Sequence, residues 1–162
     1  MLSSQQITLI TKEGHRIVTR SELKNISVLI KNELLSQNSN EVTLSDISLD
    51  SLQKVLEFAH HHKYKHPDVP KKPLPSSNIS DALEDPWDCF FIKSLDLKLL
   101  IETMSAADIM GIESLSEICQ AQLATFFKNK GIEELNQEFF VDEELTLSDE
   151  EELVKKYRIP EA

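Results

Sequence analysis

The spacing of apolar residues predicts strands and helices mixed in the first half of the chain. Two short β-prone runs, residues 7–10 and 16–19, flank a segment that contains Gly14, and together they predict a β-hairpin. A helix capped by Ser21 is expected next, because apolar residues recur at nearly helical spacing over residues 23–34.

A short strand at residues 42–44 precedes a second predicted helix. Ser48 is a suitable N-cap for that helix, and Asp50 in the first turn matches the positive end of the helix dipole. Its buried face is predicted to consist of Leu52, Val55, Leu56 and Ala59. The proline-rich segment that follows, at about residues 64–86, is expected to be a flexible loop.

The second half is expected to be helical throughout. Ser94 is the predicted cap of a helix that ends near Gly111 in a left-handed conformation. A last helix is expected after Ser148, which begins a capping-box pattern. Between these signals the apolar stripes are Leu115, Ile118, Cys119, Leu123, Phe126 and Phe127, then Ile132, Leu135 and Phe139.

Composition and charge narrow the class of protein. The 162 residues are 40% apolar and contain no run long enough to span a membrane, which predicts a soluble, non-secreted protein of the cytoplasm, the nucleus or both. The formal net charge is −11, and residues 133–162 hold 11 acids against 3 bases. This sign disfavours nucleic acid and anionic membrane as partners, while a basic protein surface stays compatible with it.

Four of the five histidines lie between His60 and His66, a pattern that raises the question of a metal site. Adjacent residues on a helix point about 100° apart, so only His62 and His66 have a usable spacing, and Pro67 disfavours continued helix there. We therefore expect no metal and no cofactor. The histidines are interpreted instead as the C-terminal end of a helix, where imidazoles meet unpaired carbonyls.

Other catalytic patterns are weak, and we expect a protein that is not an enzyme. Gly14, Gly111 and Gly131 stand alone, so no phosphate-binding loop is predicted. Cys89 and Cys119 match no metal or redox spacing and are expected to be reduced core residues. Paired carboxylates sit at predicted helix starts, where the helix dipole explains them better than acid–base catalysis.

Four of the seven phenylalanines cluster in the acidic C-terminal segment, at positions 126, 127, 139 and 140. Leaving several such rings in water would cost several kcal/mol at roughly 25 cal/mol per Å² of apolar surface. Two explanations stay open: the rings pack on the core of the first half, or they form a groove that holds a helix of a partner protein.

The order of these features resembles the S-phase kinase-associated protein 1 family, the adaptors of SCF-type cullin–RING ubiquitin ligases. The resemblance covers roughly residues 7 to 160. It rests on His61-His62-Lys63, Pro86-Trp87-Asp88, Phe91-Ile92-Lys93, Ala106-Ala107, Gly111-Ile112-Glu113-Ser114-Leu115 and Lys128-Asn129-Lys130-Gly131-Ile132-Glu133-Glu134-Leu135.

The resemblance implies an α+β, BTB/POZ-type fold extended by C-terminal helices, with domains at residues 1–125 and 126–162. It implies a non-catalytic adaptor whose partners are F-box proteins and a cullin. By position, the implied F-box-binding residues are Ile101, Met104, Leu123, Phe127, Leu135, Phe139, Val141, Leu145 and Ile159. Self-association of the free chain into a homodimer stays open.

Three departures from the family pattern qualify these expectations. Asp108-Ile109 stands where the family commonly has an Asn-Tyr pair at the cullin surface, which leaves cullin affinity open. Ile159 replaces a terminal Trp, and Leu147 replaces the proline that is hydroxylated in some relatives. The alternative function is a structural F-box-binding subunit of a non-ligase assembly, such as a kinetochore complex, with weak or no cullin binding.

Overall fold

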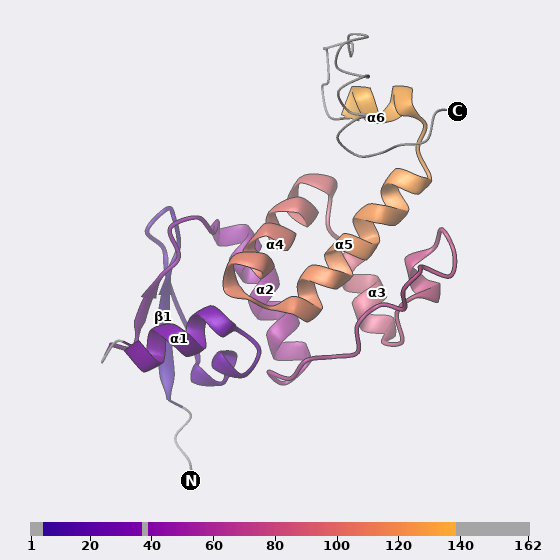
Figure 1. Cartoon of the computed structure of the whole chain (residues 1–162). Coiled ribbons are helices and arrows are strands. Elements are labelled where there is room, and N and C mark those ends of the chain that lie inside the picture. Colours follow the sequence, from indigo (N-terminus) through magenta and orange to yellow (C-terminus); the bar gives the residue numbers. More distant parts are fainter. Residues whose placement is uncertain (1–4, 37–38, 139–162) are drawn as a thin grey trace, which may run out of the picture. The chain divides into compact units, whose positions relative to one another are not determined.

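The computed structural model describes residues 5–36 and 39–138. The chain divides into two units, Met1–Lys128 and Asn129–Ala162, and each is described by itself. Within the described residues the protein is α+β, with one small sheet and a larger set of helices (Figure 1). The predicted fold class is confirmed at this level. None of the helices in these ranges is both long and apolar enough to cross a membrane.

The predicted hairpin is confirmed. Strands β1 (Gln6–Ile10) and β2 (Arg16–Arg20) pair antiparallel, and Gly14 takes a φ of 84° in the turn, a conformation that suits glycine. Strand β3 (Glu41–Thr43) pairs parallel to β1, so the sheet order is β2-β1-β3. The central strand β1 turns Ile7 and Leu9 into the core.

The single helix predicted after Ser21 is wrong, because the segment forms two elements. A 3₁₀ helix, η1 (Ser21–Asn25), precedes the α-helix α1 (Val28–Ser36), and Ser21 lies inside η1 rather than capping it. Ser27 separates the two: its buried hydroxyl accepts a hydrogen bond from the Ile30 amide (3.2 Å) and donates one to the Met110 carbonyl (2.6 Å). A serine whose side chain bonds the backbone interrupts a regular helix.

Helix α2 (Leu49–His61) forms as predicted. The Ser48 hydroxyl accepts a hydrogen bond from the Ser51 amide (3.3 Å), and the apolar face packs into the core. Leu52, Val55 and Ala59 of the predicted face are buried and Leu56 is half-buried. Phe58, which was not predicted, is also buried. The helix ends where Lys63 and Tyr64 take positive φ values of 51° and 57°.

The proline-rich segment packs on the core at several points. Tyr64, Ile79, Ala82 and Leu83 are buried, and a short 3₁₀ helix, η2 (Ile79–Asp81), lies within it. It leads into α3 (Pro86–Lys93), a helix that the sequence analysis did not predict.

Helices α4 (Leu97–Met110) and α5 (Glu113–Lys128) pack against each other, and α4 also packs on α2 and α1. Gly111 ends α4 with a φ of 66°, as predicted. The predicted cap Ser94 is wrong: Asp96 accepts the hydrogen bond from the Leu99 amide (2.7 Å), because Ser94 instead ends α3 by donating to the Phe91 carbonyl (2.6 Å).

The second unit contains α6 (Ile132–Glu138), which matches the predicted stripe after Gly131. The helix expected after Ser148 lies outside the described residues.

Candidate functional site

The helix pair α4–α5 carries four of the predicted F-box-binding residues. Ile101 and Met104 lie about one turn apart on α4 and are half-buried, so they share a face of that helix. Leu123 and Phe127 lie one turn apart on α5, where Leu123 is half-buried and 42% of Phe127 is exposed. Met104 and Leu123 both pack against the core. Met104 and Leu123 are therefore held in place by the core, while Phe127 exposes part of its ring.

The two described phenylalanines of the C-terminal cluster differ in exposure. Phe126 is half-buried, whereas Phe127 is among the most exposed large apolar residues of the described chain. Their rings meet edge to face, with centroids 5.9 Å apart and an interplanar angle of 82°. The arrangement leaves an aromatic surface at the C-terminal end of α5.

The remaining residues of the predicted F-box face lie elsewhere. Leu135 is half-buried on α6, which belongs to the second unit. Phe139, Val141, Leu145 and Ile159 lie outside the described residues. The complete F-box face thus stays a prediction, of which the structure describes four residues on α4 and α5 and Leu135 on α6.

The predicted cullin-binding residues, Asp108 and Ile109, occupy the last turn of α4. Asp108 is exposed, and its carboxylate accepts a hydrogen bond from the Ser116 hydroxyl of α5, which in turn accepts one from Gln120 (2.9 Å). Ile109 is 41% exposed. This turn presents an anchored carboxylate beside an exposed apolar side chain, and its contact with a cullin stays a prediction.

Both cysteines are free thiols, as predicted. Cys119 is fully buried and Cys89 is half-buried. Burial, with a smaller contribution from the Asp108 carboxylate, raises the pKa of Cys119 to about 12. At neutral pH Cys119 is therefore a protonated core side chain rather than a nucleophile.

The histidines at the end of α2 turn toward α3 rather than toward the last carbonyls of their own helix. His61 Nε2 lies 3.1 Å from Asp85 Oδ2, and His62 Nε2 lies 2.7 Å from Asp88 Oδ1. The Trp87 ring stacks on His61 with centroids 3.8 Å apart and an interplanar angle of 7°. We call these five residues the α2–α3 cluster; it ties the end of one helix to the start of the next.

The two carboxyl groups of the α2–α3 cluster titrate differently. The Trp87 amide, which donates to Asp85 at 2.8 Å, and secondarily the hydrogen bond from His61 lower the pKa of Asp85. Asp88 is 3% exposed, and burial raises its pKa against the opposing effect of His62. The Asp88–His62 pair is thus a buried one in which each group satisfies the other.

The same cluster contains the set of side chains that could hold a metal ion in the described ranges. Ligand atoms of His61, His62 and Asp85 lie within 4.8 Å of one another. Both histidines already bond carboxylates, and Trp87 covers one of them. These contacts are explained by the packing of α2 against α3 without a metal. The absence of a metal stays an expectation.

Sequence reasoning missed the partners of the histidines because they lie 24 and 26 residues further along the chain. The dipeptide Asp85-Pro86 is a local sequence signal for the start of the helix that carries these partners. An aspartate followed by a proline is a common start for a helix, and here Asp85 is the N-cap and Pro86 the first helical residue.

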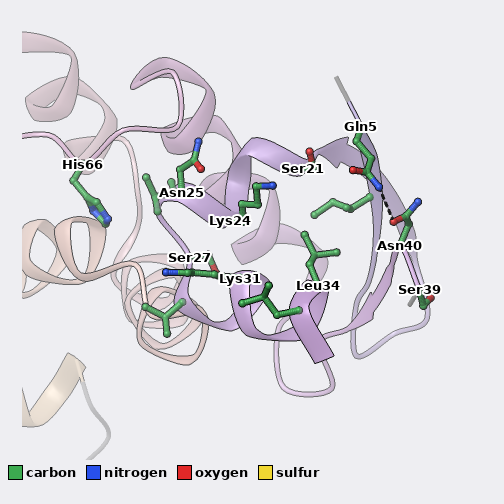
Figure 2. A pocket seen from close by; sticks show the side chains of 14 residues that line it. Gln5, Ser21, Lys24, Asn25, Ser27, Lys31, Leu34, Ser39, Asn40 and His66 are labelled. Carbon is green, nitrogen blue, oxygen red and sulfur yellow. Dashed lines mark hydrogen bonds between the residues drawn. The ribbon is translucent and has the colours of Figure 1, made fainter. Parts of the chain in front are cut away.

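A hollow of about 750 Å³ lies beside α1, and Figure 2 shows the side chains that line it. Lys24 of η1 and Lys31 of α1 reach it together with Leu34, and a hydrogen bond of 3.3 Å between Gln5 and Asn40 marks its edge at the sheet. None of the described lining residues is acidic. We call it the α1 hollow; its lining combines the two lysines with apolar and neutral polar side chains.

Comparison with known proteins gives relatives along nearly the whole chain. No protein-family model matches the sequence. An "S-phase kinase-associated protein 1 homolog" from Tetrahymena thermophila is 31% identical over 151 residues, which cover 93% of this chain and 90% of the relative. An "E3 ubiquitin ligase complex SCF subunit sconC" from Arthroderma benhamiae is 26% identical over 153 residues (93% and 92%). A protein of the same name from Aspergillus clavatus is 26% identical over 152 residues (93% and 94%).

Proposed function

The chain belongs to the S-phase kinase-associated protein 1 family, and from this membership we propose that it is the adaptor subunit of an SCF-type E3 ubiquitin ligase. One part of the chain holds the F-box of a substrate receptor, and another part holds a cullin scaffold. The observation that carries the proposal is the similarity to a relative of this family over 93% of the chain.

The adaptor is proposed to be non-catalytic. Its thiol Cys119 is buried and protonated, and its histidines at the end of α2 are engaged with carboxylates of α3. These groups support the fold. Substrate choice then resides in the F-box partner, and ubiquitin transfer resides in the enzyme that the cullin carries.

We assign the sheet and helices of the first unit to a BTB/POZ-type fold and place the cullin contact at Asp108 and Ile109. The F-box contact begins at the α4–α5 pair, where Phe127 offers an exposed ring, and continues through Leu135 and the predicted residues beyond it. Affinity for the F-box comes from these apolar anchors, and charges around them affect the association rate more than the strength.

The names of the relatives favour the ligase role over the kinetochore alternative, since two of them are named as subunits of an SCF ligase complex. In line with this role we propose a location in the cytoplasm, the nucleus or both.

The test is capture of a purified F-box protein and of a cullin N-terminal domain by the full chain. We expect Phe127→Asp to abolish F-box capture, because a carboxylate would be buried against apolar side chains of the partner, where an unpaired charge is costly. Phe139→Asp is expected to have the same effect. Capture is measured by size-exclusion chromatography and calorimetry.

Phe90→Asp is the matched control, since Phe90 is 74% exposed on α3 and lies outside the proposed face. It should leave F-box capture unchanged, and circular dichroism should show that all three variants stay folded. Equal capture by wild type, Phe127→Asp and Phe139→Asp would reject the proposed groove.

A further inference from the structure

The α1 hollow has the size of a small-molecule site. Its volume of about 750 Å³ falls within the range of roughly 300–1,000 Å³ that ligand pockets commonly have. Its floor is part of the core, because Ile7 and Ile26 line it and both are buried. The core therefore holds the hollow in shape without the help of a ligand.

Two lysines from separate elements give the hollow a positive charge. Lys24 of η1 and Lys31 of α1 both line it, and in Figure 2 they lie between His66 at one end and Gln5 and Asn40 at the other. Neither lysine has an ion-pair or hydrogen-bond partner among residues 5–36 and 39–138. The hollow is thus a place where an anion meets two available cations.

The lack of a carboxylate beside these lysines is notable in a chain with a net charge of −11. Five other lysines of the described chain lie within 4.0 Å of a glutamate carboxylate, namely Lys12, Lys54, Lys71, Lys72 and Lys98. The described lining of the hollow contains no acidic side chain that could neutralise Lys24 and Lys31 in the same way. An external anion would supply the charge that the protein itself does not.

Two cations match a phosphate monoester better than a carboxylate. A phosphate monoester carries a charge of roughly −1.5 to −2 near pH 7 and has three strong acceptor oxygens, whereas a carboxylate carries a single charge on two oxygens. Because Lys24 and Lys31 belong to different elements, they can approach one phosphate group from two sides. Asn25, which also lines the hollow, adds an uncharged amide donor.

The rest of the lining suits a body attached to the phosphate. Leu34 is half-buried and Leu35 is exposed, and both line the hollow beside Lys31. Gln5 and Asn40 bring amide groups at the sheet edge, where they share a hydrogen bond of 3.3 Å. A phosphate ion alone would leave most of the volume and the two leucines unused.

We propose that the α1 hollow binds a small organic phosphate, a phosphate monoester on a partly apolar body. The phosphate group lies between Lys24 and Lys31, and the body packs against Leu34 and Leu35. This site adds a small-molecule ligand to the adaptor role, and its occupation requires neither an F-box protein nor a cullin.

Calorimetric titration of the full chain with three probes tests the class of ligand. Phenyl phosphate has the dianion and an apolar body, inorganic phosphate lacks the body, and benzoate carries a single charge. We expect phenyl phosphate to bind with a Kd of about 1 mM or tighter, and the other two to bind at least about fivefold more weakly. Its binding should weaken as the salt concentration rises.

Substitutions in the hollow test the place of binding. Lys24→Met and Lys31→Met remove a charge and keep the aliphatic stem, so each should weaken phenyl phosphate binding by about threefold and the double variant by about tenfold. Leu35→Ser, at a position that is 79% exposed, should weaken phenyl phosphate binding by about threefold and leave inorganic phosphate binding unchanged.

Lys98→Met is the matched control, because its side chain is 87% exposed on α4 and does not line the hollow. It should bind phenyl phosphate as wild type does. Amide NMR spectra should show that phenyl phosphate shifts the signals of Lys24, Lys31 and Leu35. All variants should keep the wild-type unfolding midpoint and F-box capture, which shows that the fold is intact.

Weaker binding by the lysine variants alongside wild-type binding by Lys98→Met supports the site. The site is wrong if wild type does not bind phenyl phosphate, or if the double lysine variant binds it as tightly as wild type does. Equal affinity for phenyl phosphate and either of the other probes would reject an organic phosphate as the ligand class. F-box capture is measured separately, so none of these results alters the adaptor function.

Discussion

At the scale of single residues, the buried pair of His62 and Asp88 is a contact whose loss should lower stability. Removing one member of a buried, hydrogen-bonded pair leaves the other without a partner, at a cost of about 3 kcal/mol. We expect Asp88→Ala to lower the free energy of unfolding by that amount in urea titrations. Asp68→Ala, at an exposed position of the proline-rich segment, is the control and should change it little.

A double variant checks whether the loss belongs to the pair. His62→Ala/Asp88→Ala should be less destabilised than the sum of the two single variants, since neither group is then left unpaired. Additive losses would show that the two side chains act separately and that the 2.7 Å contact contributes nothing of its own.

Asp85 gives the α2–α3 cluster a dependence on pH. Its pKa is lowered in the folded protein, chiefly by the Trp87 amide and then by His61, so its ionised form stabilises the fold above the ordinary aspartate pKa. That contribution is lost as the pH falls through the lowered, folded-state pKa. We expect Asp85→Asn, which still caps α3, to be less stable than wild type at pH 6, and the gap to close toward pH 3.

Thermal unfolding followed by circular dichroism from pH 6 to pH 3 measures this gap. Asp50→Asn, in the first turn of α2, tests whether any helix-start carboxylate behaves alike. A gap between wild type and Asp85→Asn that stays constant across the range would show that the charge of Asp85 does not stabilise the fold.

At the scale of elements, the junction of α1 and α4 depends on glycine at position 111. Gly111 and Gly14 both have positive φ, which costs a residue with a Cβ roughly 1–2 kcal/mol. Only Gly111 also lies against a neighbour, with Val28 at 2.9 Å from an added Cβ, whereas nothing lies within 4 Å of one at Gly14.

We therefore expect Gly111→Ala to lower the free energy of unfolding more than Gly14→Ala does, by about 1 kcal/mol or more, because it adds overpacking to the backbone cost. Chemical denaturation of both variants measures the difference. Equal losses would mean that Val28 moves aside freely and that the junction is not tightly packed.

The elements that sequence reasoning found are those whose signals are local. The hairpin, the Ser48 cap of α2 and the left-handed end of α4 at Gly111 each depend on residues within a turn of one another. Of the elements it missed, α3 has a local signal in Asp85-Pro86, whereas the division of the segment after Ser21 depends on a tertiary contact. Ser27 splits the 21–36 segment through a bond to Met110, and no local pattern reports a partner 83 residues away.

The candidate site also has a part that sequence reasoning predicted and a part that depends on tertiary structure. Family resemblance selected Ile101, Met104, Leu123 and Phe127, and the structure places these on the packed α4–α5 pair. Nothing in the sequence indicated that two lysines would share a hollow with the apolar face of α1. That arrangement follows from how η1 and α1 meet, and η1 was itself not predicted.

At the scale of the whole molecule, charge is distributed in a way that suits an adaptor. Residues 133–162 carry 11 of the 28 acidic residues, so the rest of the chain is far closer to neutral. Mutual repulsion between acidic tails opposes indiscriminate association, whereas a local pair of lysines attracts an acidic segment.

Trp87 is a fluorescent probe of the contact between α2 and α3. It is the chain's single tryptophan, and its ring lies flat on His61 at 3.8 Å and near Phe91 at 4.9 Å. Ultraviolet emission from the indole therefore reports the docking of α3 on α2 without contributions from other sites. Stopped-flow mixing of unlabelled protein would show, in real time, when that joint closes during folding and whether a bound partner disturbs it.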